Sequence, residues 1–365
     1  MNYNTVRFMQ KAMLGLLVLV LVGCGQAIAP TTLPPIAALS TPPAPTLVAS
    51  VAPTVALMPT RAALTRVVPT ATPVPPRLLA DRDSSLPRTM FGPVAPAGQW
   101  LVTRDAARFT VFNLRGQSSV ASTFAPSTTL GLPLEWGANG ALLLFTTPTI
   151  TQTLWALEPT TGISTTLLST TAGLIRGAAW LNTTIIYATE RDELLLHAYG
   201  STNQAQIVAR LPNQRLVAML TSPTRREVAL IVGSTVSPTL ELYRFDEQFQ
   251  LLYVDRSTGG EADARAAWSA RGELAYNLGD GLHIYNPATN SIQTTDLDAL
   301  PLTWFGADVL ARQRANGALV RWSMSGIQPF ETGNGPLVVD DAHVINAREV
   351  ALLIGGQVWQ VTLEK

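Results

Sequence analysis

Few side chains of this sequence could carry out covalent or acid–base chemistry. The chain has one cysteine, Cys24, and three histidines, His197, His283 and His343. A thiol can carry a lipid, whereas an imidazole can transfer protons near neutral pH or bind a metal ion. A lone thiol cannot form a disulfide within its own chain, so Cys24 needs another explanation.

The residues before Cys24 supply that explanation. Residues 1–11 contain two basic residues and no acidic one, and residues 12–22 form an unbroken apolar run. This pattern is typical of a secretory signal peptide, because the run is too short to span a bilayer comfortably. The run ends in Leu21-Val22-Gly23-Cys24, which resembles the lipobox of bacterial lipoproteins. The resemblance implies a signal peptide over residues 1–23 and a lipid on Cys24. An uncleaved anchor, or an ordinary signal peptide with a chance cysteine, is the alternative.

Residues 24–76 are the expected linker. They are rich in Pro, Thr, Ala and Val, and residues 27–76 hold 12 of the 26 prolines. Proline removes amide donors and favours extended backbone in the preceding residue, so neither a helix nor a central strand can continue through the segment. We expect a disordered, semi-stiff tether that holds a lipid-anchored, extracytoplasmic domain away from the membrane.

The charge distribution argues against nucleic acid as a partner. The chain has 25 basic residues (Lys and Arg) and 25 acidic residues (Asp and Glu). Residues 1–80, however, carry five basic residues and no acidic one. Residues 81–365 therefore carry a net charge of −5. A nucleic-acid-binding domain normally presents a basic stripe, which is missing here.

A repeat defines the region from about residue 86 onward. Residues 268–295 contain four short apolar stretches separated by turns rich in Gly, Pro, Asn and Asp, which predicts four antiparallel strands. A first marker, at the end of one strand, recurs every 36 to 47 residues, at Val94, Trp136, Trp180, Thr221, Trp268, Trp304 and Ile345. A second marker follows each of them in phase, at Phe112, Trp155, His197, Tyr243, Tyr285, Trp322 and Trp359. Four strands per repeat of about 40 residues is typical of a β-propeller blade. We therefore predict an all-β, seven-bladed β-propeller of four-stranded antiparallel blades over residues 77–365.

Two segments also resemble a known family. Residues 222–232, SPTRREVALIV, and residues 268–285, WSARGELAYNLGDGLHIY, resemble the WD40-like repeat of TolB-type periplasmic propellers. The resemblance implies the same blade but no particular activity. The sequence departs from the family where an aspartate of the turn is replaced by Asn139, Thr224 or Arg271.

The tryptophans and histidines have a structural interpretation. Seven of the eight tryptophans occupy one of the two marker positions of the repeat. We therefore expect them to pack as wedges between adjacent blades. His197 and His283 lie in equivalent predicted strands and are expected to be structural. There is no HExxH sequence, no GxSxG sequence and no glycine-rich nucleotide loop. We therefore expect no enzyme activity, no catalytic residues, no metal and no cofactor.

These observations favour a non-catalytic binding or scaffolding module. Its partner would be a protein or a polymer of the cell envelope, and we expect a monomer. The alternative is a cell-envelope enzyme of propeller type, either a lyase or a cofactor-dependent dehydrogenase. Solute capture for transport is less favoured, because it would call for a two-lobed α/β pattern.

Two segments of the predicted propeller have particular roles. Blade seven lacks an outer strand after residues 357–363, and an unpaired edge would leave the ring open. Residues 77–90 are the predicted ring-closing strand. The largest spacing between first markers falls before Trp268, so residues 254–268 form a predicted partner-binding loop. Its charged residues are Asp255, Arg256, Glu261, Asp263 and Arg265.

Overall fold

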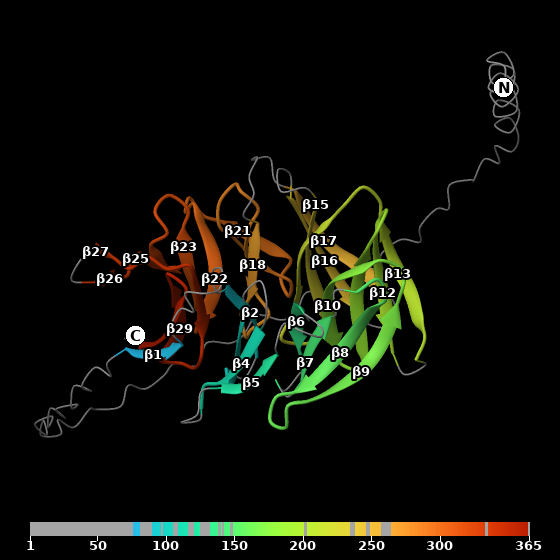
Figure 1. Ribbon diagram of the computed structural model, residues 1–365. Helices are drawn as coiled ribbons and strands as arrows, with labels where there is room; N and C mark the ends of the chain where they lie inside the picture. The colour runs from blue at the N-terminus through green and yellow to red at the C-terminus, as the bar shows by residue number, and fades with distance from the viewer. Residues whose placement is uncertain are drawn as a thin grey trace, which may run out of the picture. The chain divides into compact units, whose positions relative to one another are not determined.

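The computed structural model describes residues 76–80, 90–95, 98–104, 109–115, 120–124, 132–137, 140, 142–146, 149–200, 203–233, 238–245, 249–256, 264–332 and 335–363. All of them belong to one compact unit, which covers Pro69–Lys365. Every regular element among the described residues is a β-strand (Figure 1). The signal peptide and most of the linker predicted from the sequence, including Cys24, lie outside the described residues.

The strands form seven four-stranded antiparallel sheets, each of which is one blade. From the innermost strand outward, blade one is β2 (Met90–Val94), β3 (Trp100–Arg104), β4 (Phe109–Asn113) and β5 (Val120–Phe124). Blade two is β6 (Leu132–Trp136), β7 (Leu143–Thr146), β8 (Gln152–Glu158) and β9 (Ile163–Thr170). Blade three is β10 (Leu174–Leu181), β11 (Thr184–Glu190), β12 (Leu194–Tyr199) and β13 (Ala205–Leu211). Blade four is β14 (Leu216–Thr221), β15 (Glu227–Gly233), β16 (Pro238–Phe245) and β17 (Phe249–Arg256).

The remaining three blades follow the same order. Blade five is β18 (Arg265–Trp268), β19 (Leu274–Asn277), β20 (His283–Asn286) and β21 (Ser291–Thr294). Blade six is β22 (Ala299–Phe305), β23 (Asp308–Gln313), β24 (Leu319–Ser323) and β25 (Gly326–Pro329). A small hairpin of β26 (Glu331–Thr332) and β27 (Gly335–Pro336) comes next. Blade seven is β28 (Asp341–Val344), β29 (Glu349–Ile354), β30 (Gln357–Thr362) and β1 (Arg77–Ala80).

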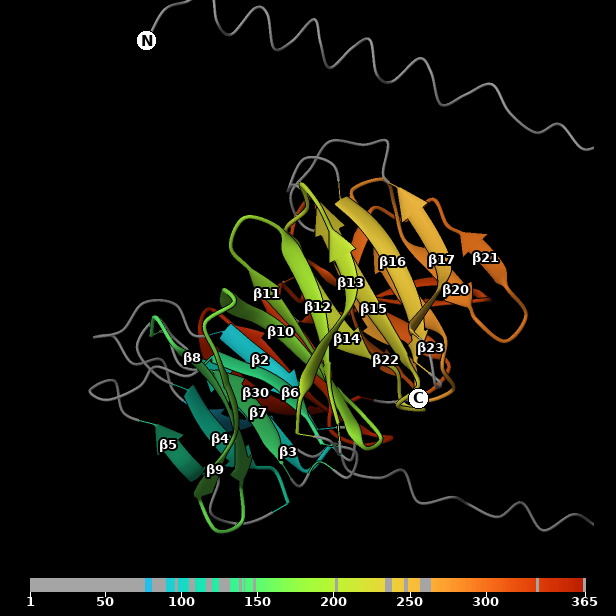
Figure 2. The same cartoon turned by 90° about the vertical axis from the view of Figure 1, so that its right-hand side faces the viewer.

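The innermost strands close into a ring. Each contacts the innermost strand of the next blade, in the order β2, β6, β10, β14, β18, β22, β28 and back to β2. Figure 2 shows neighbouring blades such as β10–β13 and β14–β17 stacked face against face. The all-β propeller of seven four-stranded blades predicted from the repeat is therefore confirmed. Residues 268–295, in which four strands are predicted, contain the end of β18 and the whole of β19, β20 and β21.

The seventh blade is completed by a strand that precedes the first blade in the sequence. β1 pairs antiparallel with β30, with Arg77 opposite Gln360 and Leu78 opposite Trp359. β1 lies within residues 77–90, which the sequence analysis assigned to ring closure, although Met90 itself belongs to β2. Leu79 packs with the cluster between blades one and seven. The N-terminal strand thus joins the last blade to the first.

The hydrophobic core consists of seven separate clusters, one in each space between neighbouring blades. The middle strand β15 shows how the sequence builds them, because alternate side chains of a strand point to opposite faces. Val228, Leu230 and Val232 pack toward blade three, whereas Ala229 and Ile231 pack toward blade five. A strand buried on both faces therefore reads as a continuous apolar run.

The tryptophans of the repeat lie in these clusters, as predicted. Trp136 is fully buried between blades one and two, and its indole Nε1 donates to the carbonyl of Pro93 at 2.9 Å. Trp304 makes the same bond to Ala267 at 2.8 Å, and Trp268 makes it to Leu220 at 3.4 Å. In each case the indole hydrogen-bonds to the innermost strand of the preceding blade. These tryptophans are committed to holding blades together.

Candidate functional site

The innermost strands surround a central channel with a cavity volume of about 500 Å³. Its lining includes residues from all seven blades. We call the end where the innermost strands begin the start end, and the end where they finish the finish end. Charged side chains lie at both ends, and they are arranged differently.

At the finish end, one arginine connects three blades. Arg225, in the turn between β14 and β15, donates to the carbonyls of Trp136 at 2.9 Å, Gly137 at 3.1 Å and Trp180 at 3.2 Å. It also lies 3.6 Å from the carboxylate of Glu135. Only 5% of Arg225 is exposed. Its guanidinium therefore hydrogen-bonds to backbone carbonyls at the ends of β6 and β10 and balances the charge of a carboxylate in β6.

Glu135 completes this finish-end cluster. Burial raises the pKa of its carboxyl, while the positive charge of Arg225 and a hydrogen bond from Thr221 oppose the rise. The Thr221 hydroxyl donates to Glu135 at 2.7 Å, so blade four contacts blade two a second time. A buried ion pair of this kind is costly to break, because removing one partner leaves an uncompensated charge.

Sequence reasoning missed Arg225, although the repeat contains a signal for it. The backbone φ of Arg225 is 57°, in the left-handed region that favours glycine. The equivalent turns of blades one, two and five have Gly98, Gly140 and Gly272 at this position, with φ of 63°, 66° and 84°. An arginine where the repeat requires glycine costs about 1 kcal/mol of backbone strain. Its four polar contacts offset that cost.

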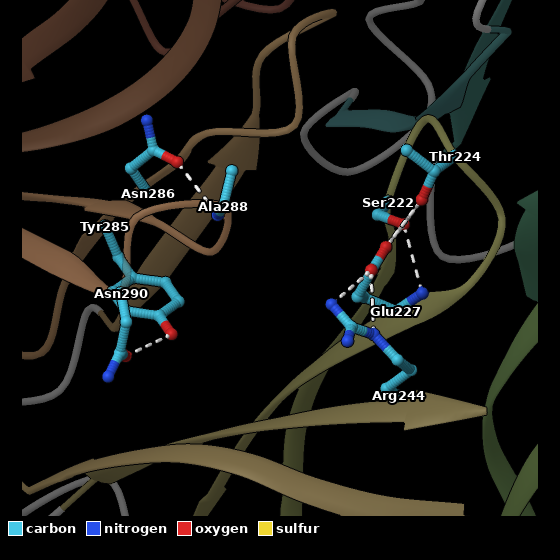
Figure 3. Close-up of polar contacts among 8 residues, drawn as sticks. All are labelled: Ser222, Thr224, Glu227, Arg244, Tyr285, Asn286, Ala288 and Asn290. Atoms are coloured by element: carbon cyan, nitrogen blue, oxygen red, sulfur yellow. Dashed lines mark hydrogen bonds and ion pairs between the residues drawn. The ribbon is translucent and has the colours of Figure 1, made fainter. Parts of the chain in front are cut away.

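The same turn holds a second polar cluster that is structural (Figure 3). Ser222 and Thr224 donate hydrogen bonds to the carboxylate of Glu227, and Arg244 lies 3.3 Å from its other oxygen. Burial alone would raise the pKa of Glu227, but these hydrogen bonds and the charge of Arg244 hold it below its ordinary value. The cluster fixes the β14–β15 turn that carries Arg225. Figure 3 also shows two hydrogen bonds at the β20–β21 turn of blade five, from the Tyr285 hydroxyl to Asn290 and from the Ala288 amide to Asn286.

At the start end, an ion pair connects blades that are not neighbours. Arg265 is the first residue of β18 in blade five, and it pairs with Asp341, the first residue of β28 in blade seven. Burial raises the pKa of Asp341, opposed by the charge of Arg265. A second cavity of about 460 Å³ shares Phe91, Arg265 and Asp341 with the channel, so the two are contiguous. The start end is therefore a polar mouth of the channel that continues into the second cavity.

The structure describes three of the five residues of the predicted partner-binding loop, and it places them in different surroundings. Asp255 lies in β17 and accepts a hydrogen bond from Tyr276 of blade five. Arg256 is exposed at the end of β17, and Arg265 lines the channel. Glu261 and Asp263 lie outside the described residues. The link between β17 and β18 comprises residues 257–264, which is shorter than the predicted loop of residues 254–268 because β17 continues to Arg256. The link between β25 and β28, residues 330–340, is longer.

The histidines also fall into two groups. His197 hydrogen-bonds to Thr189 at 2.8 Å and stacks on Tyr187 with ring centroids 4.7 Å apart. His283 hydrogen-bonds to Thr294 and stacks on Tyr276. Both are packed within blades, as predicted. His343 instead lines the channel, and sequence reasoning gave it no position.

The described residues contain no group of three or more His, Cys, Asp or Glu side chains placed to hold a metal ion. Within the same part of the chain, no helix has the length and hydrophobicity that crossing a membrane requires.

Comparison with known proteins identifies the fold. The search found no matching family model and no matching curated protein. Among solved structures, a chain of the crystal structure of the Mitotic Checkpoint Complex superposes with a TM-score of 0.54 at 12% identity, covering 78% of this chain and 98% of that one. The β-propeller domain of Cps50 (Swd1) from Myceliophteria thermophila superposes with a TM-score of 0.54 at 15% sequence identity, covering 79% of this chain and 100% of that one. The Dos1 propeller superposes with a TM-score of 0.51 at 13% sequence identity, covering 74% of this chain and 76% of that one. The likeness shows a WD40-type seven-bladed propeller.

Proposed function

We propose that this propeller is a non-catalytic binding module that presents its channel mouth to a protein partner in the cell envelope. The single observation that supports this most is the arrangement of the ionisable side chains. Several that could take part in chemistry instead join blades or pack within them, as Arg225 with Glu135 and His197 with Thr189 do. The ring is therefore a rigid support, and its polar start end is the surface offered to a partner.

The tether belongs to the same proposal. The sequence ending in Leu21-Val22-Gly23-Cys24 supports lipidation of Cys24, which would anchor the propeller outside the cytoplasmic membrane on a proline-rich linker. Intact-mass measurement of protein extracted from membranes tests this. We expect a mature chain that begins at Cys24 with a covalently attached lipid. A different mature N-terminus, or a Cys24→Ala variant that still sediments with membranes, would exclude the lipid anchor.

Site-specific photo-crosslinking tests partner binding at the mouth. Amine-reactive crosslinkers are unsuitable, because Lys11 and Lys365 are the only lysines. We would place a benzophenone amino acid at Met90, which is 43% exposed and lines the second cavity. The matched control is Met324, which is 81% exposed in the turn between β24 and β25.

We expect irradiation in cells to give one discrete protein adduct from Met90 and none from Met324, identified by mass spectrometry. Equal adducts from both positions would indicate random collision. No adduct at Met90, together with one from another face, would move the binding surface away from the start end.

A further inference from the structure

We propose that the start end of the channel is a carboxylate-binding site, which receives an acidic side chain of a protein partner. The inference rests on the proposed binding function and adds the chemistry of the ligand. It comes from a surplus of hydrogen-bond donors around one buried carboxylate. The residues involved are Arg104, Arg265, Arg312, Asp341 and His343.

The charges at this end are unbalanced. Four arginines and two aspartates line the start end of the two cavities: Arg104, Arg176, Arg265, Arg312, Asp340 and Asp341. Arg176 shares the carboxylate of Glu190 with Arg215, at 3.3 Å and 3.2 Å. Residues 81–365 as a whole carry a net charge of −5. A positive mouth would attract an anionic group to this end of the channel.

Three groups at the mouth have donor capacity without an acceptor. Arg104, at the end of β3, forms no ion pair or hydrogen bond through its side chain to any described residue, although it lines the channel. Arg312 donates through Nη1 to the carbonyl of Asp340 at 3.3 Å, but its buried Nε has no partner. The Nε2 of His343 is also buried without a partner, and it can donate when the neutral ring carries its hydrogen on Nε2. Buried polar groups are normally hydrogen-bonded, so the unpaired Arg312 Nε and His343 Nε2 beside the cavities indicate a missing acceptor.

A carboxylate suits these groups better than a neutral ligand. It accepts several hydrogen bonds at once, and guanidinium groups bind it in a planar, bidentate geometry. The unpaired donors come from blades one, six and seven, which are consecutive around the ring. Asp341, already paired with Arg265 of blade five, marks one side of the site.

Titration with a fluorescein-labelled hexaglutamate peptide at low salt, followed by anisotropy, tests the site. We expect saturable binding that weakens as salt is added, because the contact is electrostatic. Arg104→Ala should weaken binding about tenfold, since it removes a charge-assisted hydrogen bond. The matched control is Arg271→Ala, because Arg271 is exposed in the β18–β19 turn at the finish end. It should bind like the wild type.

Several outcomes would overturn the proposal. These are the absence of saturable binding, equal weakening by the two substitutions, and tighter binding of succinate or inorganic phosphate than of hexaglutamate. The last result would assign the site to a free small anion. If Arg104→Ala lowers the melting temperature, Arg104→Gln is the second variant, because it keeps part of the aliphatic stem and a polar end while removing the charge. A partner crosslinked at another surface while hexaglutamate fails to bind would leave the binding function standing and exclude the carboxylate site.

Discussion

At the scale of single residues, Arg225 shows how a repeat protein can depend on a side chain that breaks the repeat. The turn before β15 would form readily with glycine, as it does in blades one, two and five. Arginine is strained there, yet its guanidinium reaches the carbonyls of Trp136, Gly137 and Trp180. Blades two, three and four are therefore held together by one cation at the finish end.

The first prediction concerns the loss of that cation. Arg225→Ala should lower the free energy of unfolding by about 3–5 kcal/mol, because Glu135 is left as a buried, unpaired carboxylate. Arg226→Ala is the matched control, since Arg226 is the exposed neighbour and its loss should change stability by less than about 0.5 kcal/mol. Urea unfolding followed by tryptophan fluorescence measures both. Similar unfolding midpoints for the two variants would contradict the role of Arg225.

A second prediction concerns pH and His343. Burial lowers the pKa of His343 to about 3, whereas in the unfolded chain the imidazole takes up a proton near its ordinary value of about 6.5. Between these two values the unfolded chain binds more protons, so the free energy of unfolding falls as the pH falls. Between about pH 7.5 and about pH 5, the wild type should lose about 1–2 kcal/mol more than His343→Gln. Glu135 and Asp341, whose raised pKa values act in the opposite direction, are common to both chains. Parallel pH profiles for the two proteins would contradict the prediction.

At the scale of elements, the blades could be predicted because their information is local. Residues 265–294 hold four strands and three turns, and each strand pairs with its neighbour in sequence. Alternating apolar residues and turn glycines specify such a sheet without reference to the rest of the chain. Because each repeat forms one such sheet, the seven repeats in the sequence predict seven blades.

What could not be predicted depends on contacts between blades. Arg225 and Glu135 are far apart in sequence, and no local pattern links them. The pairing of Arg265 with Asp341 crosses the channel between blades five and seven for the same reason. The large marker spacing before Trp268 predicts a long link, yet much of that spacing is taken up by two long strands, β16 and β17. Marker spacing alone does not separate strand length from loop length.

The closing strand leads to a third prediction. Leu79 packs against the cluster between blades one and seven, whereas Leu78 is 41% exposed. Leu79→Asn should lower the melting temperature by several degrees, and Leu78→Asn should change it little. Deletion of residues 76–80 should have a larger effect than Leu79→Asn, because it also exposes the edge of β30. Calorimetry measures all three variants. Indistinguishable melting of the deletion variant and the wild type would show that β1 does not hold the ring closed.

At the scale of the whole molecule, the ring is joined by hydrogen bonds within a blade. Blade seven combines β1 with β28, β29 and β30, so the joint is a strand ladder. Elsewhere, neighbouring blades are joined by one covalent link, side-chain packing and individual side-chain hydrogen bonds, such as the one from Trp136 to Pro93. A ring joined only by side-chain packing would lose the ladder and should open more easily.

Circular permutation tests this as the fourth prediction. β1 and β30 are antiparallel, with Arg77 opposite Gln360, so a short linker can join Leu363 to Pro76. With new termini in the β20–β21 turn at residues 287–290, β21 comes first in the permuted chain and β20 comes last. Blade five is then completed by strands from both ends of the chain. New termini between β13 and β14, at residues 212–215, leave whole blades at each end. The first permutant should melt at a higher temperature than the second, and the reverse order would contradict the importance of the ladder.

The position of β1 also sets an order of events during synthesis. A ribosome makes β1 before any other strand of the ring, but its partner β30 emerges only after the intervening blades. At about 5–20 residues per second, the delay is on the order of tens of seconds. Six blades can pair locally while β1 waits with its backbone donors and acceptors open, near the equally open outer strands of finished blades. The protein's first-made ring strand is thus its last to find a partner, and its folding must avoid premature pairing throughout translation.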